Sequence, residues 1–98
     1  MEVRVARLAE IELDEAISYY ERQKSGLGRK FYLEIEKTVE RIKRFPKSCP
    51  AVGIYTRRCL VNRFPFAIFY AIKNEENILI LAVAHTHRNP AHFINRIK

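Results

Sequence analysis

Two amphipathic helical patterns, separated by a short link, constrain this chain more than any other feature. Apolar residues recur at helical spacing first at Ala9, Leu13, Ala16, Ile17 and Tyr20, and then at Leu27, Phe31, Ile35, Val39 and Ile42. Between them, "KSGLG" supplies Gly26 and Gly28, which suit a reversal of the chain. Pro46 disfavours helical geometry at Phe45 and should end the second helix there. The sequence therefore predicts an antiparallel helical hairpin.

The rest of the chain has strand patterns. Met1 to Ala6 alternates apolar and charged residues, with Met1, Val3 and Val5 facing inward. After the loop "PKSCPAVG", the runs "TRRCLV", "FAIFYAI" and "ILILAVAH" follow at hairpin spacing. The last run is apolar on both faces, which is typical of a central strand. We therefore predict an α+β fold: an N-terminal strand, the helical hairpin, a three-stranded antiparallel meander, and a short helix or turn from Pro90.

Length and composition indicate one soluble domain. The chain has 98 residues, of which 48% are hydrophobic and 30% charged, enough for a single core over residues 1–98. Its longest apolar run, Ile78 to Ala84, is too short to cross a bilayer, and charges near the N-terminus do not fit a signal peptide. We expect a cytoplasmic protein in which Cys49 and Cys59 are free thiols.

The charge of the chain is uneven. The formal net charge is +7, and residues 51–98 hold seven Lys and Arg against two Glu. The first half is nearly balanced, with eleven basic residues against nine acidic ones. This asymmetry favours an anionic partner, such as a nucleic acid or an acidic protein segment.

The end of the chain, "ILAVAHTHRNPAHFINRIK", concentrates cationic and titratable groups. It holds three histidines and two arginines without an acidic residue. A metal site is one interpretation, but no carboxylate or thiol lies nearby in the sequence to complete it and the arginines would repel a cation, so we expect no metal. A second is acid/base chemistry on RNA, in which histidine moves protons and arginine holds phosphate. A third is a docking surface that mixes cations with aromatic residues.

Two of these stretches resemble a known family. "RRCLVNRFPFAIFYAI" and "ILILAVAHTHRNPAHFINR" are similar to the RelE/ParE toxins of bacterial type II toxin–antitoxin systems, and most similar to the ParE-like branch, often described as plasmid stabilisation proteins. "ELDEAISYYERQKSGLGRKF" resembles the helical hairpin of the family with its "GLG" turn. The residues that carry the match are Arg58, Phe64, Pro65, Phe66, Tyr70, His85, Arg88, Pro90, His92, Phe93 and Arg96.

The resemblance implies a growth-arresting toxin without a cofactor, held inactive in a hetero-oligomer by a cognate antitoxin. ParE-like relatives poison DNA gyrase by binding it, and this is the first hypothesis for the present chain. The alternative is a RelE-like, ribosome-dependent and metal-independent mRNA endoribonuclease, in which His85, His92, Arg58 and Arg88 would be catalytic. A third possibility is a non-toxic member that only binds antitoxin.

The candidate surface for target or antitoxin is common to these hypotheses. It comprises Arg58, Arg63, Phe64, Tyr70, His85, His87, Arg88, His92, Phe93 and Arg96. The chain departs from the family pattern at two positions, with Phe93 where the ParE-like branch usually has tryptophan and His92 where it often has tyrosine. Because no tyrosine follows Tyr70, the nuclease alternative lacks a usual participant.

Overall fold

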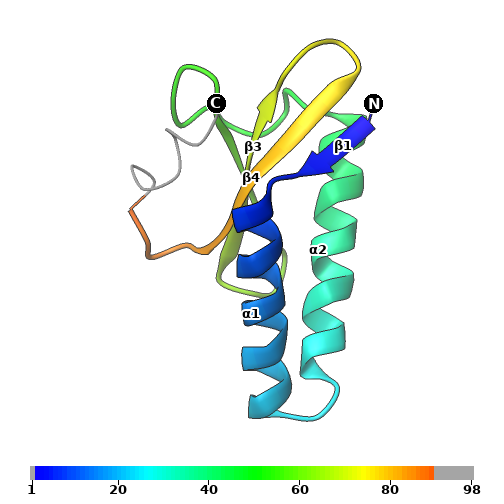
Figure 1. Cartoon of the computed structure of the whole chain (residues 1–98), viewed down its shortest axis with the longest axis vertical. Helices are drawn as coiled ribbons and strands as arrows, with labels where there is room; N and C mark the ends of the chain where they lie inside the picture. The colour runs from blue at the N-terminus through cyan, green and yellow to red at the C-terminus, as the bar shows by residue number, and fades with distance from the viewer. Residues whose placement is uncertain (1, 90–98) are drawn as a thin grey trace.

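The order of elements is the one that the sequence predicts. The computed structural model describes residues 2–89, and the predicted helix or turn from Pro90 lies outside them. The elements are β1 (Glu2–Val5), α1 (Arg7–Gln23), α2 (Leu27–Arg44), β2 (Arg57–Leu60), β3 (Phe66–Ile72) and β4 (Asn77–His85) (Figure 1). The α+β prediction is confirmed, and α2 ends at Arg44, immediately before the residue that precedes Pro46.

The four strands form one mixed sheet in the order β1-β4-β3-β2. Strands β2, β3 and β4 make the predicted antiparallel meander, and β1 pairs in parallel with β4, with Val3 opposite Ile78. β4 therefore lies between two strands, as its apolar pattern predicts. The register of β3 and β4 shifts between Phe69 and Tyr70, where Leu81 is the extra residue of a bulge.

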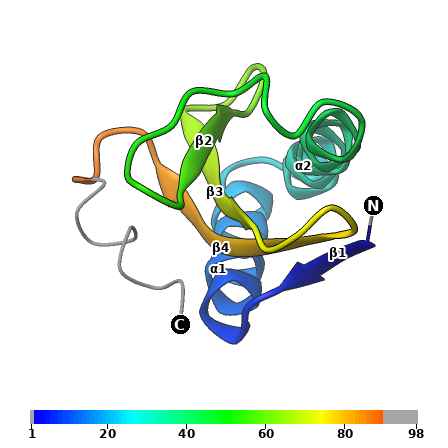
Figure 2. The same ribbon diagram turned by 90° about the horizontal axis from the view of Figure 1, so that it is seen from above.

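Both helices lie on the same side of the sheet (Figure 2). The main core forms there, between Phe31, Ile35 and Ile42 of the helices and Ile68, Ile80 and other residues of the strands. We call this side the helix-covered face. The opposite side, the second face, carries a smaller buried cluster of Ala67, Phe69, Ala82 and Ala84, against which Val52 packs.

The reversal between α1 and α2 is fixed by one carboxylate and two glycines. The Glu21 carboxylate accepts hydrogen bonds from the backbone N–H groups of Gly26 and Gly28, at 2.9 and 3.0 Å. Gly26 has a φ of 88°, in the left-handed region that favours glycine. Gly28 is buried, and a Cβ there would lie 2.7 Å from the carbonyl oxygen of Ile17. The two helices thus approach closely because this position has no side chain.

Candidate functional site

The first candidate region lies at the end of the β3–β4 ladder. His85 is paired with Phe66 on the helix-covered face, and their rings meet edge to face with centroids 5.5 Å apart. The Nδ1 atom of His85 accepts a hydrogen bond of 3.1 Å from the backbone N–H of His87, and the two imidazoles lie 4.9 Å apart. His85 is half-buried and His87 exposed. The structure therefore brings two of the predicted histidines together.

Arg88 joins this region through α1. Its guanidinium lies 3.9 Å from the Glu12 carboxylate, and the other oxygen of Glu12 accepts a 3.1 Å hydrogen bond from the N–H of Val83. A hollow of about 280 Å³ is lined here by Glu12, Glu15, Ala16, Phe66, Val83, Ala84, His85 and Arg88. An acidic residue of α1 thus balances the charge of Arg88, although none lies near it in the sequence. We call this region the His85–Arg88 corner.

The neighbouring arginines of β2 point to opposite faces of the sheet, as strand geometry predicts. Arg57 is opposite Tyr70, and its guanidinium donates to the carbonyl oxygens of Cys49 and Lys47, at 2.7 and 3.1 Å. Arg58 is opposite Phe69 and so belongs to the second face. Its Nε atom is buried without a hydrogen-bond partner in the part of the chain that the structure describes. Arg57 therefore holds a loop in place, whereas the Nε–H group of Arg58 has no acceptor among the described residues.

Arg63 and Phe64 lie in the turn between β2 and β3. Arg63 is exposed and has a φ of 70°, which is uncommon for a residue with a side chain. Phe64 points the other way and packs edge to face on Tyr20 and Phe31, with centroids 4.9 and 5.1 Å apart. The turn is thus anchored in the aromatic part of the core by Phe64 and leaves Arg63 exposed to solvent.

One residue of the predicted surface, Tyr70, belongs to the core instead. Its side chain is fully buried, and its hydroxyl donates a 2.6 Å hydrogen bond to the carbonyl oxygen of Pro46. Burial is the main cause that raises the pKa of this phenol above its ordinary value. Tyr70 holds the start of the loop after α2 to β3, so it offers no surface to a partner. The predicted docking surface of cations and aromatic residues had included Tyr70, whereas its alternation with Phe66 and Ile68 had left a core position open.

Three residues of the predicted site, His92, Phe93 and Arg96, lie outside the described residues. Among the others, the set proposed for RNA cleavage is divided between the two faces of the sheet. His85 and Arg88 belong to the helix-covered side, since Arg88 contacts Glu12 of α1 and His85 contacts Phe66. Arg58 lies on the second face. The sheet therefore separates the Arg58 guanidinium from the His85 imidazole.

A second candidate region was missed from the sequence. An open hollow of about 670 Å³, which we call the apolar groove, is lined by Val5, Leu13, Tyr32, Leu33, Ile35, Glu36, Lys37, Val39 and Glu40. Val5, Tyr32 and Leu33 are each about two-fifths exposed, and the alternation of β1 had predicted that Val5 faces the core. Tyr32 and Leu33 stand outside the core stripe of α2, and these off-stripe apolar residues were the signal available in the sequence.

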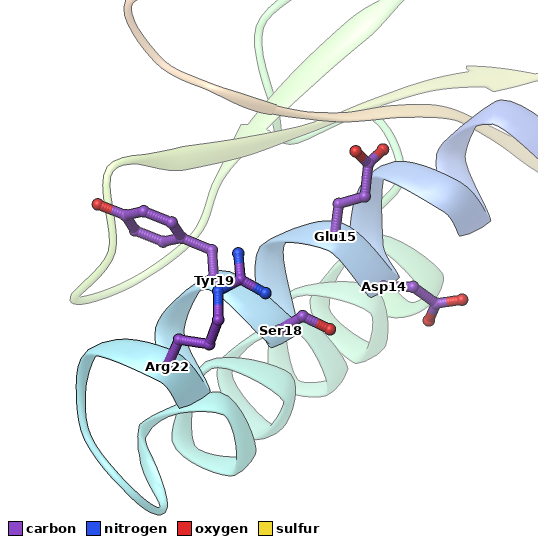
Figure 3. Close-up of a pocket in the computed structure, with 5 residues that line it drawn as sticks. All are labelled: Asp14, Glu15, Ser18, Tyr19 and Arg22. Atoms are coloured by element: carbon purple, nitrogen blue, oxygen red, sulfur yellow. The ribbon is translucent and has the colours of Figure 1, made fainter.

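A third hollow lies along α1. It is lined by Asp14, Glu15, Ser18, Tyr19 and Arg22, whose side chains all project from this helix (Figure 3). The residues come from a single element and include carboxylates, a hydroxyl, a phenol and a guanidinium that are largely exposed. We therefore assign it no chemistry. Within residues 2–89, no group of three or more His, Cys, Asp or Glu side chains is placed to hold a metal ion, and no helix is long and apolar enough to span a membrane.

Comparisons with known proteins agree with this architecture. The family model described as the ParE toxin of the parDE type II toxin–antitoxin system matches residues 3–90. A search of curated protein sequences finds no match. Among solved structures, the chromosomal ParDE toxin–antitoxin system from P. aeruginosa contains a similar chain, with a TM-score of 0.64 and 21% identity over 87% of this chain and 95% of that chain. That likeness supports the fold, and the family model covers most of the sequence. The chain therefore belongs to the ParE toxin family of type II toxin–antitoxin systems.

Proposed function

We propose that this ParE-family toxin arrests growth by binding DNA gyrase rather than by cleaving RNA. The main observation in favour of binding is that the residues proposed for RNA cleavage are divided between the two faces of the sheet. Metal-free RNA cleavage needs a base, an acid and cations around one phosphate, within hydrogen-bond reach of each other. His85 and Arg58 lie on opposite faces of the sheet, and Arg88 faces Glu12. Binding makes no such demand, because separate patches can contact one large partner.

The chain suits a large anionic or DNA-bound target. Arg63 is exposed at the β2–β3 turn, and Arg58 of β2 adds a second arginine nearby in the sequence. Arg88, which follows β4, is a third, although Glu12 lies beside it. Arginines of this kind commonly anchor protein interfaces, and a net charge of +7 attracts a protein that holds DNA.

A reconstituted assay would test the target. The purified protein is added to gyrase with supercoiled DNA, and, in parallel, to ribosomes translating a defined mRNA. We expect cleaved DNA to accumulate and the mRNA to stay intact. Cleavage of the mRNA without an effect on gyrase would support the ribosomal alternative and contradict the proposal. No effect in either assay would favour a non-toxic, antitoxin-binding member.

Substitutions would then separate binding from proton transfer. Replacing His85 and His92 together by Ala should leave gyrase poisoning within about threefold, since no proton transfer is required. Arg63→Ala should weaken it about tenfold or more. Arg4→Ala, an exposed arginine of β1, is the matched control and should have no effect. Loss of poisoning in a folded double-histidine variant would refute a mechanism of binding alone.

We further propose that a segment of the cognate antitoxin occupies the apolar groove. Membership in a two-component family supports a protein occupant. The groove is bounded by β1 and the two helices and combines exposed Val5, Tyr32 and Leu33 with the charged rim residues Glu36, Lys37 and Glu40. An amphipathic helix fits such a surface, because its apolar stripe can enter the groove while its polar face meets the rim.

Leu33→Glu tests this occupant. A carboxylate would have to be buried on binding, so we expect affinity for the antitoxin to fall about 30-fold or more by calorimetry. Growth arrest should persist and escape neutralisation, because the groove is separate from Arg63 and the His85–Arg88 corner. Ile54→Glu is the matched control, since Ile54 is 90% exposed outside the groove. Equal affinities of the two variants would exclude the groove as the docking site.

A further inference from the structure

The two cysteines, Cys49 in the loop after α2 and Cys59 in β2, lie beside a short antiparallel bridge. Ala51 and Arg57 form a bridge between the loop and the start of β2. Its hydrogen bonds run from the N–H of Val52 to the Thr56 oxygen and from the N–H of Arg58 to the Pro50 oxygen, at 2.8 and 3.0 Å. Cys49 lies in a bend two residues before Ala51, and Cys59 lies in β2 two residues after Arg57. Both thiols are thus beside this bridge, where they are close enough to hydrogen-bond each other.

This register also fixes the type of pair. The hydrogen bonds flank the Ala51–Arg57 position without joining these two residues directly, so it is a non-hydrogen-bonded pair. In such a pair the Cα atoms lie about 4.5 Å apart, so Ala51 and Arg57 hold the two chains close together beside the cysteines. A disulfide needs Cα atoms about 4.4–6.8 Å apart, a range that chains held this closely can reach.

The packing around the sulfurs agrees with this placement. Both cysteines belong to the same core cluster, with Cys49 8% and Cys59 2% exposed, and both line one surface hollow together with Arg41, Ser48 and Arg58. Arg41 Nη2 donates to the Cys59 sulfur at 3.2 Å and to the Leu60 oxygen at 2.7 Å. A cation on the sulfur stabilises the thiolate, the form that attacks an oxidised sulfur.

We propose that Cys49 and Cys59 form a reversible intramolecular disulfide when the cell is exposed to a peroxide. The Cys49 thiolate, the less buried of the two, attacks one peroxide oxygen. A sulfur–oxygen bond forms, the oxygen–oxygen bond breaks, and the leaving hydroxide takes up a proton to become water. The Cys59 thiolate then attacks the Cys49 sulfur, forming the S–S bond and releasing the second oxygen as water. Two thiols lose two electrons and two protons, and the peroxide is reduced to two water molecules.

Closure would tie the loop that follows α2 to β2. That loop is already held by Arg57, which donates to the Cys49 and Lys47 oxygens, and by the Tyr70 hydroxyl on the Pro46 oxygen. The native contacts thus hold the loop where the bond would form, and the disulfide removes its freedom in the unfolded chain. The inference concerns the thiols alone and does not depend on the toxin's target.

Burial of the Cys59 thiol should limit the rate of disulfide formation. Desolvation is the main cause that raises the pKa of Cys59 to about 11, and Arg41 opposes the shift. Little of this thiol is ionised at neutral pH. If its attack limits the rate, closure should accelerate about tenfold per pH unit between pH 7 and 10, until another step becomes limiting.

Intact-mass spectrometry of the folded full-length protein tests the proposal. After treatment with hydrogen peroxide, we expect a monomer lighter by about 2 Da, with no thiol left to alkylate and with the mass restored by dithiothreitol. Its Tm should rise by about 10 °C relative to the reduced protein. A product that only gains oxygen, a disulfide-linked dimer, or two thiols that remain alkylatable while a denatured sample oxidises would each overturn it.

Two matched variants locate the bond. Cys49→Ala and Cys59→Ala each leave one thiol and should give no product lighter by 2 Da, whereas Cys49→Ala should also react more slowly with peroxide because the remaining thiol is the more buried one. Arg41→Met should slow closure several-fold and leave its product unchanged. Because the main result is obtained on the unaltered protein, failure of a variant to fold does not affect it. An unchanged closure rate in Arg41→Met would remove the cation from the mechanism.

Discussion

At the scale of single residues, the buried hydroxyl of Tyr70 gives the clearest test of a local contact. Tyr70→Phe removes the 2.6 Å hydrogen bond to Pro46 and leaves a carbonyl oxygen without this donor. We expect the free energy of unfolding to fall by about 1–2 kcal/mol, measured by urea denaturation with an unchanged m value. Tyr55→Phe is the control, because Tyr55 is 68% exposed and should show no change. Equal stabilities of the two variants would contradict a structural role for the Tyr70 hydroxyl.

The orientation of single residues could be predicted where it depends on local strand geometry. Contacts between residues far apart in the sequence could not be predicted. The opposite orientation of Arg57 and Arg58 follows from strand geometry and is confirmed. The pairing of Arg88 with Glu12 joins residues far apart in the chain, and nothing in the local pattern indicated it. The same holds for Cys49 and Cys59, whose approach depends on the register of a loop. Long-range partners require the sheet to be known first.

At the scale of elements, the close approach of α1 and α2 depends on Gly28. In Gly28→Ala, the new Cβ would lie 2.7 Å from the Ile17 oxygen and 3.0 Å from the Glu21 side chain, so the helices must separate. This strain should exceed the gain of about 1 kcal/mol in helix propensity, and we expect a net loss of about 1–2 kcal/mol. Thermal unfolding followed by circular dichroism would measure it. Lys30→Ala, an exposed change in the same turn, should be neutral, and a stabilised Gly28→Ala would mean that the helix contact is loose.

Elements were the part of the molecule that local patterns predict best. The run "FAIFYAI" is β3 from its first to its last residue, since its apolar residues lie between turn-forming segments. The parallel pairing of β1 with β4 was not predicted, because strand period indicates a strand and not its neighbour. The apolar groove was missed for a related reason. Tyr32 and Leu33 lie outside the core stripe, and only the position of β1 beside the helices turns them into one surface with Val5.

At the scale of the whole molecule, stability should depend on pH through two buried groups that lose a proton at high pH. They are the Cys59 thiol beside Arg41 and the Tyr70 phenol beside Arg57. Desolvation raises the pKa of Cys59 from 9.0 to about 11 and raises that of Tyr70 as well. Both groups are neutral when protonated, so the unfolded chain releases their protons at lower pH than the folded chain does. The contribution of these groups to stability is therefore fully present below about pH 9. The free energy of unfolding falls as the pH rises through about 11.

Urea denaturation of the reduced protein at intervals from pH 7 to 11 would measure this loss. For Cys59 alone, a rise of about two pKa units corresponds to a loss on the order of 2 kcal/mol across the window. Cys59→Ala should be less stable at pH 7, because it leaves a small cavity and removes the sulfur that accepts from Arg41, but its stability should decline less steeply with pH. Tyr55→Phe, which removes an exposed phenol, should keep the slope of the original protein. Parallel curves for the original protein and Cys59→Ala would show that the thiol ionises as easily folded as unfolded, and the buried dithiol would then lack the slow, pH-dependent closure inferred for it.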